Sequence, residues 1–178
     1  ARAPLPDVAL EPDLLYRLLV AEISGQRGEM GRAAFYFLRT AYETEDPRLA
    51  REATRAAVFA QDFALALKAS ELWVELAPED LEANQSHAAL LIRAGETDAA
   101  VTYLERVLAM ADKVNGHGFM MVTNLLQREQ DRRRALAVME RLIASRRDDP
   151  DALYAYARLA SVIGSNDKAL AILEDLLG

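Results

Sequence analysis

A motif of about 34 residues recurs five times along this sequence. Aligned on one small residue, the copies place an alanine at a nearly constant spacing, at Ala33, Ala66, Ala100, Ala135 and Ala169. Around each alanine, a polar turn precedes an amphipathic segment whose apolar residues recur every three or four positions. Another segment of helical periodicity precedes each turn. Periods of this length are typical of stacked helix pairs, so the sequence predicts ten helices, with no strand and with all five alanines buried at helix crossings.

Turn residues indicate where the predicted helix pairs begin. Asp46-Pro47 and Asp149-Pro150 each place a carboxylate that can cap a helix before a proline. Proline is tolerated at the first helical position because its missing N–H has no partner there. Residues 1–12 contain three prolines and are expected to be extended or disordered. The predicted array covers residues 13–178, in units of about 13–46, 47–80, 81–115, 116–149 and 150–178.

Composition excludes several classes of protein. Hydrophobic residues make up 52% of the chain and charged residues 28%, which is enough apolar material for a folded core. No apolar run approaches the roughly 18 residues that a membrane-spanning helix needs. The chain has no cysteine, which excludes disulfides, thiolate nucleophiles and iron–sulfur clusters. Its net charge of −7 argues against general nucleic-acid binding. The basic run Arg132-Arg133-Arg134 is expected to lie in a turn beside Asp131, which makes it a poor nucleic-acid site.

The third unit resembles the tetratricopeptide repeat. The motif requires, in order, a large–small pair, a large residue, a turn glycine, a small residue and two core residues. The third unit has these residue types at the motif's positions, and they are His87-Ala88, Leu91, Gly95, Ala100, Leu104 and Val107. The other units match in part, and the fourth departs most, with Gly116-His117-Gly118 at its start. The resemblance implies an all-α fold, an α–α superhelix with a concave groove. We expect it to be incomplete at the C-terminus, where Leu176-Leu177-Gly178 would leave apolar surface for further repeats or a partner to cover.

No catalytic constellation is found in the sequence. His87 lies on the core side of its predicted helix, so we expect a buried, hydrogen-bonded histidine. His117 is expected to be a loop residue, because no second ligand accompanies it at metal-binding spacing. Gly25-Gln26-Arg27-Gly28 lacks the preceding strand and the Lys-Ser/Thr of a phosphate-binding loop, so it is expected to be a turn. We therefore predict that the chain is not an enzyme and has no catalytic, metal or cofactor site.

A stripe of arginines is the strongest binding candidate. Arg48, Arg51 and Arg55 are spaced by three and four positions, which puts them on the side of a helix away from Ala53 and Ala57. A solvated face with local ion pairs, such as Arg48 with Glu52, is the alternative reading. Arginine suits carboxylates, and amide side chains can hold a peptide backbone. By its resemblance to tetratricopeptide arrays, the chain is expected to line a protein-binding groove with Arg17, Arg48, Arg51, Arg55, Gln85, Arg93, Asn124, Gln127, Arg128, Tyr154 and Arg158.

A narrower resemblance concerns function. The stretch from Ala34 to Leu108 in particular is similar to the amino-terminal part of a tetratricopeptide lipoprotein family of Gram-negative bacteria. Proteins of that family are adaptors for a periplasmic carboxy-terminal processing protease that degrades cell-wall hydrolases. The resemblance implies a periplasmic scaffold that binds the protease and its substrates and is tethered to the outer membrane by a lipid anchor outside this sequence. A scaffold for polysaccharide export or outer-membrane assembly, or an enzyme encoded downstream, are the alternatives.

Overall fold

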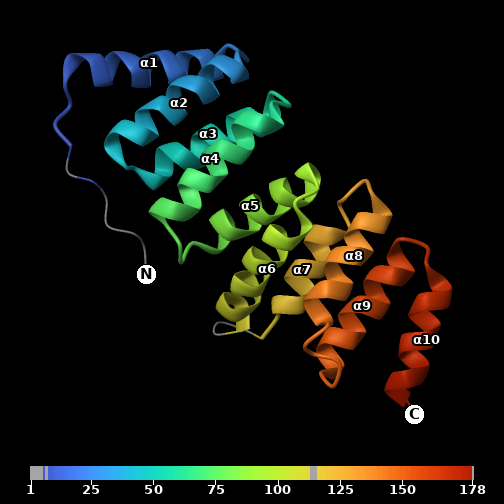
Figure 1. The fold of residues 1–178 in the computed structure, drawn as a ribbon. Helices are drawn as coiled ribbons and strands as arrows, with labels where there is room; N and C mark the ends of the chain where they lie inside the picture. The colour runs from blue at the N-terminus through green and yellow to red at the C-terminus, as the bar shows by residue number, and fades with distance from the viewer. Residues whose placement is uncertain (1–5, 7, 113–115, 178) are drawn as a thin grey trace. The chain divides into compact units, whose positions relative to one another are not determined.

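The computed structural model describes residues 6, 8–112 and 116–177, with only the backbone described at 168, 173 and 175–177. Within these ranges the regular elements are ten α-helices, and no strand is present (Figure 1). The all-α prediction is thereby confirmed. The helices are α1 (Pro12–Gln26), α2 (Met30–Thr44), α3 (Pro47–Phe59), α4 (Phe63–Leu76), α5 (Leu81–Ala94), α6 (Thr97–Asp112), α7 (Gly118–Leu126), α8 (Arg132–Ile143), α9 (Pro150–Val162) and α10 (Asn166–Leu177).

Two compact units make up the chain, and the division between them falls within α5. Unit 1 comprises residues 1–90, and unit 2 comprises residues 91–178. In unit 1, α1 packs on α2, α2 on α3 and α3 on α4. In unit 2, α6 packs on α7 and α8, α7 and α8 each pack on α9, and α9 packs on α10. The helices that pack together are therefore close to one another along the chain.

The predicted helix starts at the two Asp-Pro pairs are confirmed. The Asp46 carboxylate accepts a hydrogen bond from the backbone N–H of Arg48, at 2.9 Å, and Pro47 is the first residue of α3. The Asp149 carboxylate accepts hydrogen bonds from two backbone N–H groups in the first turn of α9, which begins at Pro150. Each aspartate satisfies donors that the helix itself leaves without partners, a contribution of about 1 kcal/mol per cap.

Left-handed residues end several helices. Gly95 and Gly164 have φ values of 89° and 82°, which glycine adopts without the steric cost that a side chain brings. Gln61 occupies the corresponding turn between α3 and α4 with φ at 58°. The turn between α3 and α4 therefore forms without glycine, at the steric cost that a side chain brings in the left-handed conformation.

The five aligned alanines are all buried, as the repeat predicts. Ala33, Ala66, Ala100 and Ala135 are fully buried, and Ala169 is nearly so. A small side chain at each position lets two helices approach closely, since a larger one would force the backbones apart.

Enlarging one of these alanines should destabilise unit 2. We expect Ala100→Leu to lower the free energy of unfolding by about 1 to 3 kcal/mol, because Ala100 has no exposed surface into which extra methyl groups could extend. Urea denaturation followed by far-UV circular dichroism measures the change. Ala99→Leu on the exposed side of the same helix is the control, and an equal midpoint for the two variants would contradict the helix alignment.

The fourth helix pair departs from the others. Its first helix, α7, has nine residues and starts at Gly118, where an added Cβ would lie 3.1 Å from the Cα of Leu108 in α6. Glycine at this position therefore allows α7 to pack closely on α6. Residues 8–11 form no regular element, and Val8 and Leu10 are exposed. The predicted apolar C-terminal surface at residues 176–178 lies outside the described side chains.

Candidate functional site

The arginine stripe lies on α3 as its spacing predicts. Ala53 and Ala57 are buried, whereas Arg48 and Arg55 are exposed and Arg51 is half-buried. The three arginines thus share the side of α3 that faces away from its core contacts. Whether this side lines a protein-binding groove remains a prediction.

Each guanidinium of this stripe has a carboxylate partner. The ion pairs are Arg48 with Asp46 (2.5 Å), Arg51 with Glu52 (3.0 Å) and Arg55 with Glu82 (2.6 Å). Arg48 therefore pairs with the capping aspartate, and not with Glu52 as the local-pair alternative had it. Three positive and three negative groups alternate here, so the stripe presents little net positive charge to an acidic ligand.

The pairs also hold these groups in their charged forms. Burial would raise the pKa of the Asp46 carboxyl, but hydrogen bonds from the side chain and backbone of Arg48 lower it below its usual value. The hydrogen bond to Asp46 raises the pKa of Arg48, and the hydrogen bond to Glu82 raises that of Arg55. A ligand carboxylate would have to displace a partner that is already in place.

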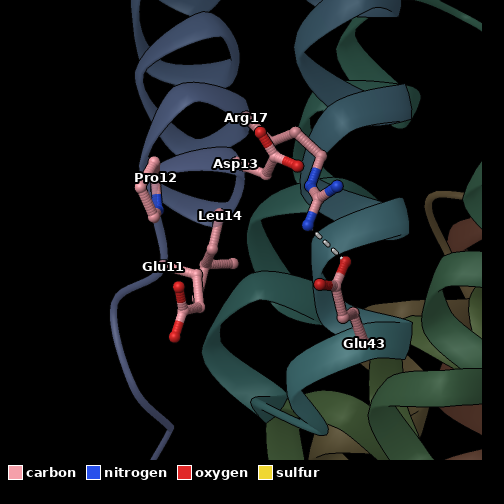
Figure 2. Close-up of a pocket in the computed structure, with 6 residues that line it drawn as sticks. All are labelled: Glu11, Pro12, Asp13, Leu14, Arg17 and Glu43. Atoms are coloured by element: carbon pink, nitrogen blue, oxygen red, sulfur yellow. Dashed lines mark hydrogen bonds and ion pairs between the residues drawn. The ribbon is translucent and has the colours of Figure 1, made fainter.

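Arg17 lies in a pocket at the start of unit 1. Figure 2 shows its guanidinium reaching from α1 to Glu43 on α2, and the ion pair measures 2.5 Å. The side chain of Arg17 is only 15% exposed, and its Nε is buried without a hydrogen-bond partner among the described residues. The pocket encloses about 450 Å³ and is lined by Glu11, Pro12, Asp13, Leu14, Arg17 and Glu43. Three carboxylates and one guanidinium make it an acidic pocket.

Gln85 and Arg93 both lie on α5, and the division between the two units falls between them. Gln85 is half-buried, whereas Arg93 is exposed. The backbone carbonyl of Arg93 accepts a hydrogen bond from Arg134.

The remaining predicted residues lie in unit 2, on α7 and α9, which pack together, and in the turn that directly follows α7. We call this the α7–α9 surface, defined by Asn124, Gln127, Arg128, Tyr154 and Arg158. The amide nitrogen of Gln127 donates to the side-chain oxygen of Asn124, at 3.3 Å. Arg128, Tyr154 and Arg158 are exposed. Asn124 and Arg158 are one repeat apart and hold equivalent positions in it, which places them on the same side of their helices.

Two guanidinium groups of the α7–α9 surface differ from those on α3. Within the described ranges, the side chains of Arg128 and Arg158 have neither a hydrogen-bond nor an ion-pair partner. An exposed, unpaired guanidinium can accept a ligand carboxylate without first losing an internal partner. The structure thus separates the paired arginines of α1 and α3 from two arginines without a described partner, Arg128 in the turn after α7 and Arg158 on α9.

A buried polar pair lies inside unit 1. The Nδ1 of His87 is 2.8 Å from the Oγ of Ser70, and both residues are buried. This confirms the expected buried, hydrogen-bonded histidine, and burial lowers the pKa of His87 to about 4. Sequence reasoning missed Ser70, as it missed Asn84, whose amide donates to two backbone carbonyls. Because Ser70 and His87 are enclosed by packed helices, they are out of reach of a substrate.

The prediction that Arg132-Arg133-Arg134 lies in a turn is wrong. The three residues form the first turn of α8, which the Asp131 carboxylate caps. Arg132 donates to the carbonyl of Ile163 at the end of α9, and Arg134 donates to that of Ile92 in α5, each at 3.0 Å. Carbonyls at helix C-termini lack intrahelical partners, so these arginines donate the hydrogen bonds that the last carbonyls of neighbouring helices need.

Other kinds of site are not found in the part of the chain that the structure describes. No group of three or more histidine, aspartate and glutamate side chains is arranged to hold a metal ion there. No described helix is long and apolar enough to cross a membrane. His117 directly precedes α7 and is exposed, in agreement with the expected loop position.

Comparison with known proteins gives matches in sequence and in fold. No protein-family model matches the chain. The TPR repeat-containing protein PA4667 of Pseudomonas aeruginosa is 32% identical over 168 residues, which cover 92% of this chain. The chain spans 28% of that relative's length.

Solved structures share the arrangement of helices. MamA (residues 41 to the end) from Desulfovibrio magneticus RS-1 matches with a TM-score of 0.54 and 15% identity, over 95% of this chain and 96% of that one. A tetratricopeptide repeat protein from Parabacteroides merdae matches with a TM-score of 0.55 and 14% identity, over 93% of this chain and 64% of that one. Identities this low show a shared fold alone. Together with the repeat and the ten described helices, these matches support the resemblance of the chain to the tetratricopeptide repeat family. The chain has the all-α, helix-pair fold of that family.

Proposed function

We propose that this chain is a non-enzymatic scaffold that binds a protein partner through the α7–α9 surface. The observation that carries the proposal is the pair of exposed, unpaired guanidinium groups of Arg128 and Arg158 in a chain whose net charge is −7. The arginines of α3 already pair with carboxylates, so they offer less to a ligand.

The chemistry of the surface favours an acidic, extended peptide segment. The planar guanidinium fork can hold a carboxylate with two hydrogen bonds. The amides of Asn124 and Gln127 can both donate to and accept from a peptide backbone. The exposed ring of Tyr154 supplies apolar contact area. Because the attraction is largely between exposed charges, salt should weaken it.

The proposed partner is a periplasmic carboxy-terminal processing protease, with cell-wall hydrolases as the substrates delivered to it. The protein would act in the periplasm, tethered to the outer membrane by a lipid anchor outside this sequence. Support comes from the resemblance of residues 34–108 to adaptors of this kind. The chain is also similar to a much longer bacterial tetratricopeptide protein, which is in keeping with the proposal that it belongs to a larger scaffold.

Reversing the two free charges should weaken binding. We expect Arg128→Glu with Arg158→Glu to lower affinity about 5- to 30-fold, which corresponds to about 1 to 2 kcal/mol, and to flatten its salt dependence. Helicity should be unchanged, since glutamate forms helices about as well as arginine at position 158 of α9, and Arg128 lies in the turn after α7. The partner is identified by affinity capture with the full-length protein and mass spectrometry, and the purified partner is then titrated by calorimetry.

The matched control reverses two arginines elsewhere. Arg39 on α2 and Arg147 in the turn before α9 are exposed and unpaired among the described residues. Arg39→Glu with Arg147→Glu changes net charge equally and should leave affinity within a factor of two. Equal losses in both double variants would indicate unspecific charge attraction. If Arg48→Glu, Arg51→Glu and Arg55→Glu together cause the larger loss, the site lies on α3. A purified protease that does not bind the full-length protein would rule out the adaptor role.

A further inference from the structure

An apolar row lies next to the unpaired arginines of the α7–α9 surface. Met120 on α7 and Tyr154 on α9 are 48% and 60% exposed, and they are one repeat apart. Because α7 and α9 pack together and both residues hold the same repeat position, their side chains lie on the same side of the two helices. Asn124 and Arg158 follow them by four positions, which is about one helical turn.

The side of α7 and α9 that carries this surface therefore has three rows of different chemistry. In order along the helices, the rows are Met120 with Tyr154, Asn124 with Arg158, and Arg128 with Val162. The first row is apolar, the second offers an amide and a guanidinium, and the third sets a guanidinium beside a valine that is 55% exposed. Residues four positions apart in a helix are separated by about 6 Å along its axis, which gives the distance between neighbouring rows.

Helix pairs that follow along the chain leave these repeat positions open. On α3, Arg55 and Phe59 hold the positions of Arg158 and Val162, three repeats earlier. Both are exposed, although further helix pairs follow α3. On α7, Met120 is exposed as well, although the pair of α9 and α10 follows it. The accessibility of the rows is thus a property of the repeat, and a helix pair added after α10 would not remove it.

The spacing of the rows matches an extended peptide segment. In such a segment, successive side chains on one side are two residues apart, which is about 7 Å. Three alternate residues of a ligand can therefore face the three rows in turn.

The amides of this surface favour an extended ligand over a helical one. Gln127 donates to Asn124 at 3.3 Å, and these two side chains form no other hydrogen bond among the described residues. Each amide group can make several hydrogen bonds, so donors and acceptors remain for a ligand. An extended segment has backbone N–H and C=O groups free to bond with them, whereas those of a helix are already paired internally.

We propose that this surface recognises an extended segment of the partner in which one large apolar residue and two acidic residues occupy alternate positions, with the apolar residue at one end. The inference rests on the proposed function and specifies the sequence that the partner carries. The apolar side chain packs on Met120 and Tyr154. The first carboxylate bonds to Arg158 and the second to Arg128, where the methylenes of a glutamate can also contact Val162.

The apolar row adds selectivity that charge alone does not give. Two exposed guanidinium groups attract any acidic segment, whatever its other residues are. Burial of a leucine side chain on the first row distinguishes a segment that carries it at the right spacing from one that is merely acidic.

Two short peptides test the motif, one for each chain direction. Leu-Ser-Glu-Ser-Glu and Glu-Ser-Glu-Ser-Leu carry acetyl and amide ends, so that only side chains contribute charge. A fluorescent label on a flexible linker lets anisotropy report binding to the full chain. One of the two peptides should bind, and replacing its leucine by alanine should weaken binding about 5- to 20-fold. Moving the leucine to the neighbouring serine position keeps the composition but breaks the alternation, and it should weaken binding to a similar extent.

Variants of the protein assign this preference to the apolar row. Met120→Ala with Tyr154→Ala should bind the leucine and alanine peptides almost equally, which completes a double-mutant cycle. Both side chains are about half exposed or more, so their removal should leave the fold intact, and far-UV circular dichroism verifies this. The matched control is Phe35→Ala with Tyr42→Ala on α2, which removes two aromatic residues that are 52% and 58% exposed. It should keep the preference for leucine.

Several outcomes would overturn the inference. Equal binding of the leucine and alanine peptides would mean that the apolar row is not used, and a preference that survives Met120→Ala with Tyr154→Ala would place the apolar contact elsewhere. Binding of neither peptide at millimolar concentration would also contradict it, as would tighter binding of a helical peptide with leucine and glutamates four positions apart. In each case the proposed function still stands if Arg128→Glu with Arg158→Glu weakens binding of the purified partner, so the two can fail independently.

Discussion

Replacing Trp73 by alanine should lower the free energy of unfolding by about 3 to 5 kcal/mol. Trp73 lies on α4, is 2% exposed and is among the largest fully enclosed side chains of the described residues. Its removal loses the burial of the indole and leaves a cavity that packed helices close only in part. The loss approaches the whole stability of many small domains, so unit 1 should unfold at much lower urea concentration.

The measurement needs a probe other than fluorescence, because Trp73 is the only tryptophan of the chain. Urea titration followed by far-UV circular dichroism serves for both forms of the protein. Phe59→Ala removes a largely exposed aromatic residue in the same unit, and it should change the stability by no more than about 0.5 kcal/mol. Similar midpoints for the two variants would show that α4 does not pack through Trp73.

Acid should destabilise unit 1 through His87. Burial lowers the pKa of His87 to about 4 in the folded chain, against about 6.5 when unfolded. The folded state thus favours the neutral imidazole. The stabilisation that the neutral His87 gives the folded state is fully present above pH 6.5 and is lost as pH falls from 6.5 towards 4. The difference in pKa corresponds to a loss of about 3 kcal/mol over this window.

His87→Gln isolates this contribution from that of the carboxylates. Glutamine does not titrate and can hydrogen-bond to Ser70, whose Oγ lies 2.8 Å from the Nδ1 of His87. Stability measured in urea at several values between pH 7 and 4 should fall more steeply for the unmodified chain than for the variant. Parallel pH profiles would mean that His87 ionises as readily in the folded chain as in the unfolded one.

The helices could be predicted from the sequence because their signals are local. A cap such as Asp46 acts within three positions, and a turn glycine such as Gly95 needs only its own φ. The small residue at each helix crossing recurs with the repeat, so the repeat alone indicates that Ala100 belongs to the core. The periodicity likewise places His87 in the core, although it gives no sign of its partner Ser70.

The side-chain pairs could not be predicted in the same way. Arg55 pairs with Glu82, 27 residues away, and Arg134 reaches a carbonyl at Ile92, 42 residues away. Both contacts depend on how neighbouring helices rotate and on which rotamer a long side chain adopts. Spacing shows that Arg48, Arg51 and Arg55 share a helix side. It does not show that each of them already forms an ion pair with a carboxylate of the chain.

The neighbour-to-neighbour packing of the helices has a consequence for how this protein is made. In each unit, the helices that pack together follow closely along the chain. Few distant segments must therefore meet before stable structure forms, which favours rapid folding. Early helix pairs can form while the ribosome still holds the later ones. For the same reason, a pair gained or lost in evolution disturbs mainly its two neighbours, so chains of this kind can change length while keeping their remaining surfaces.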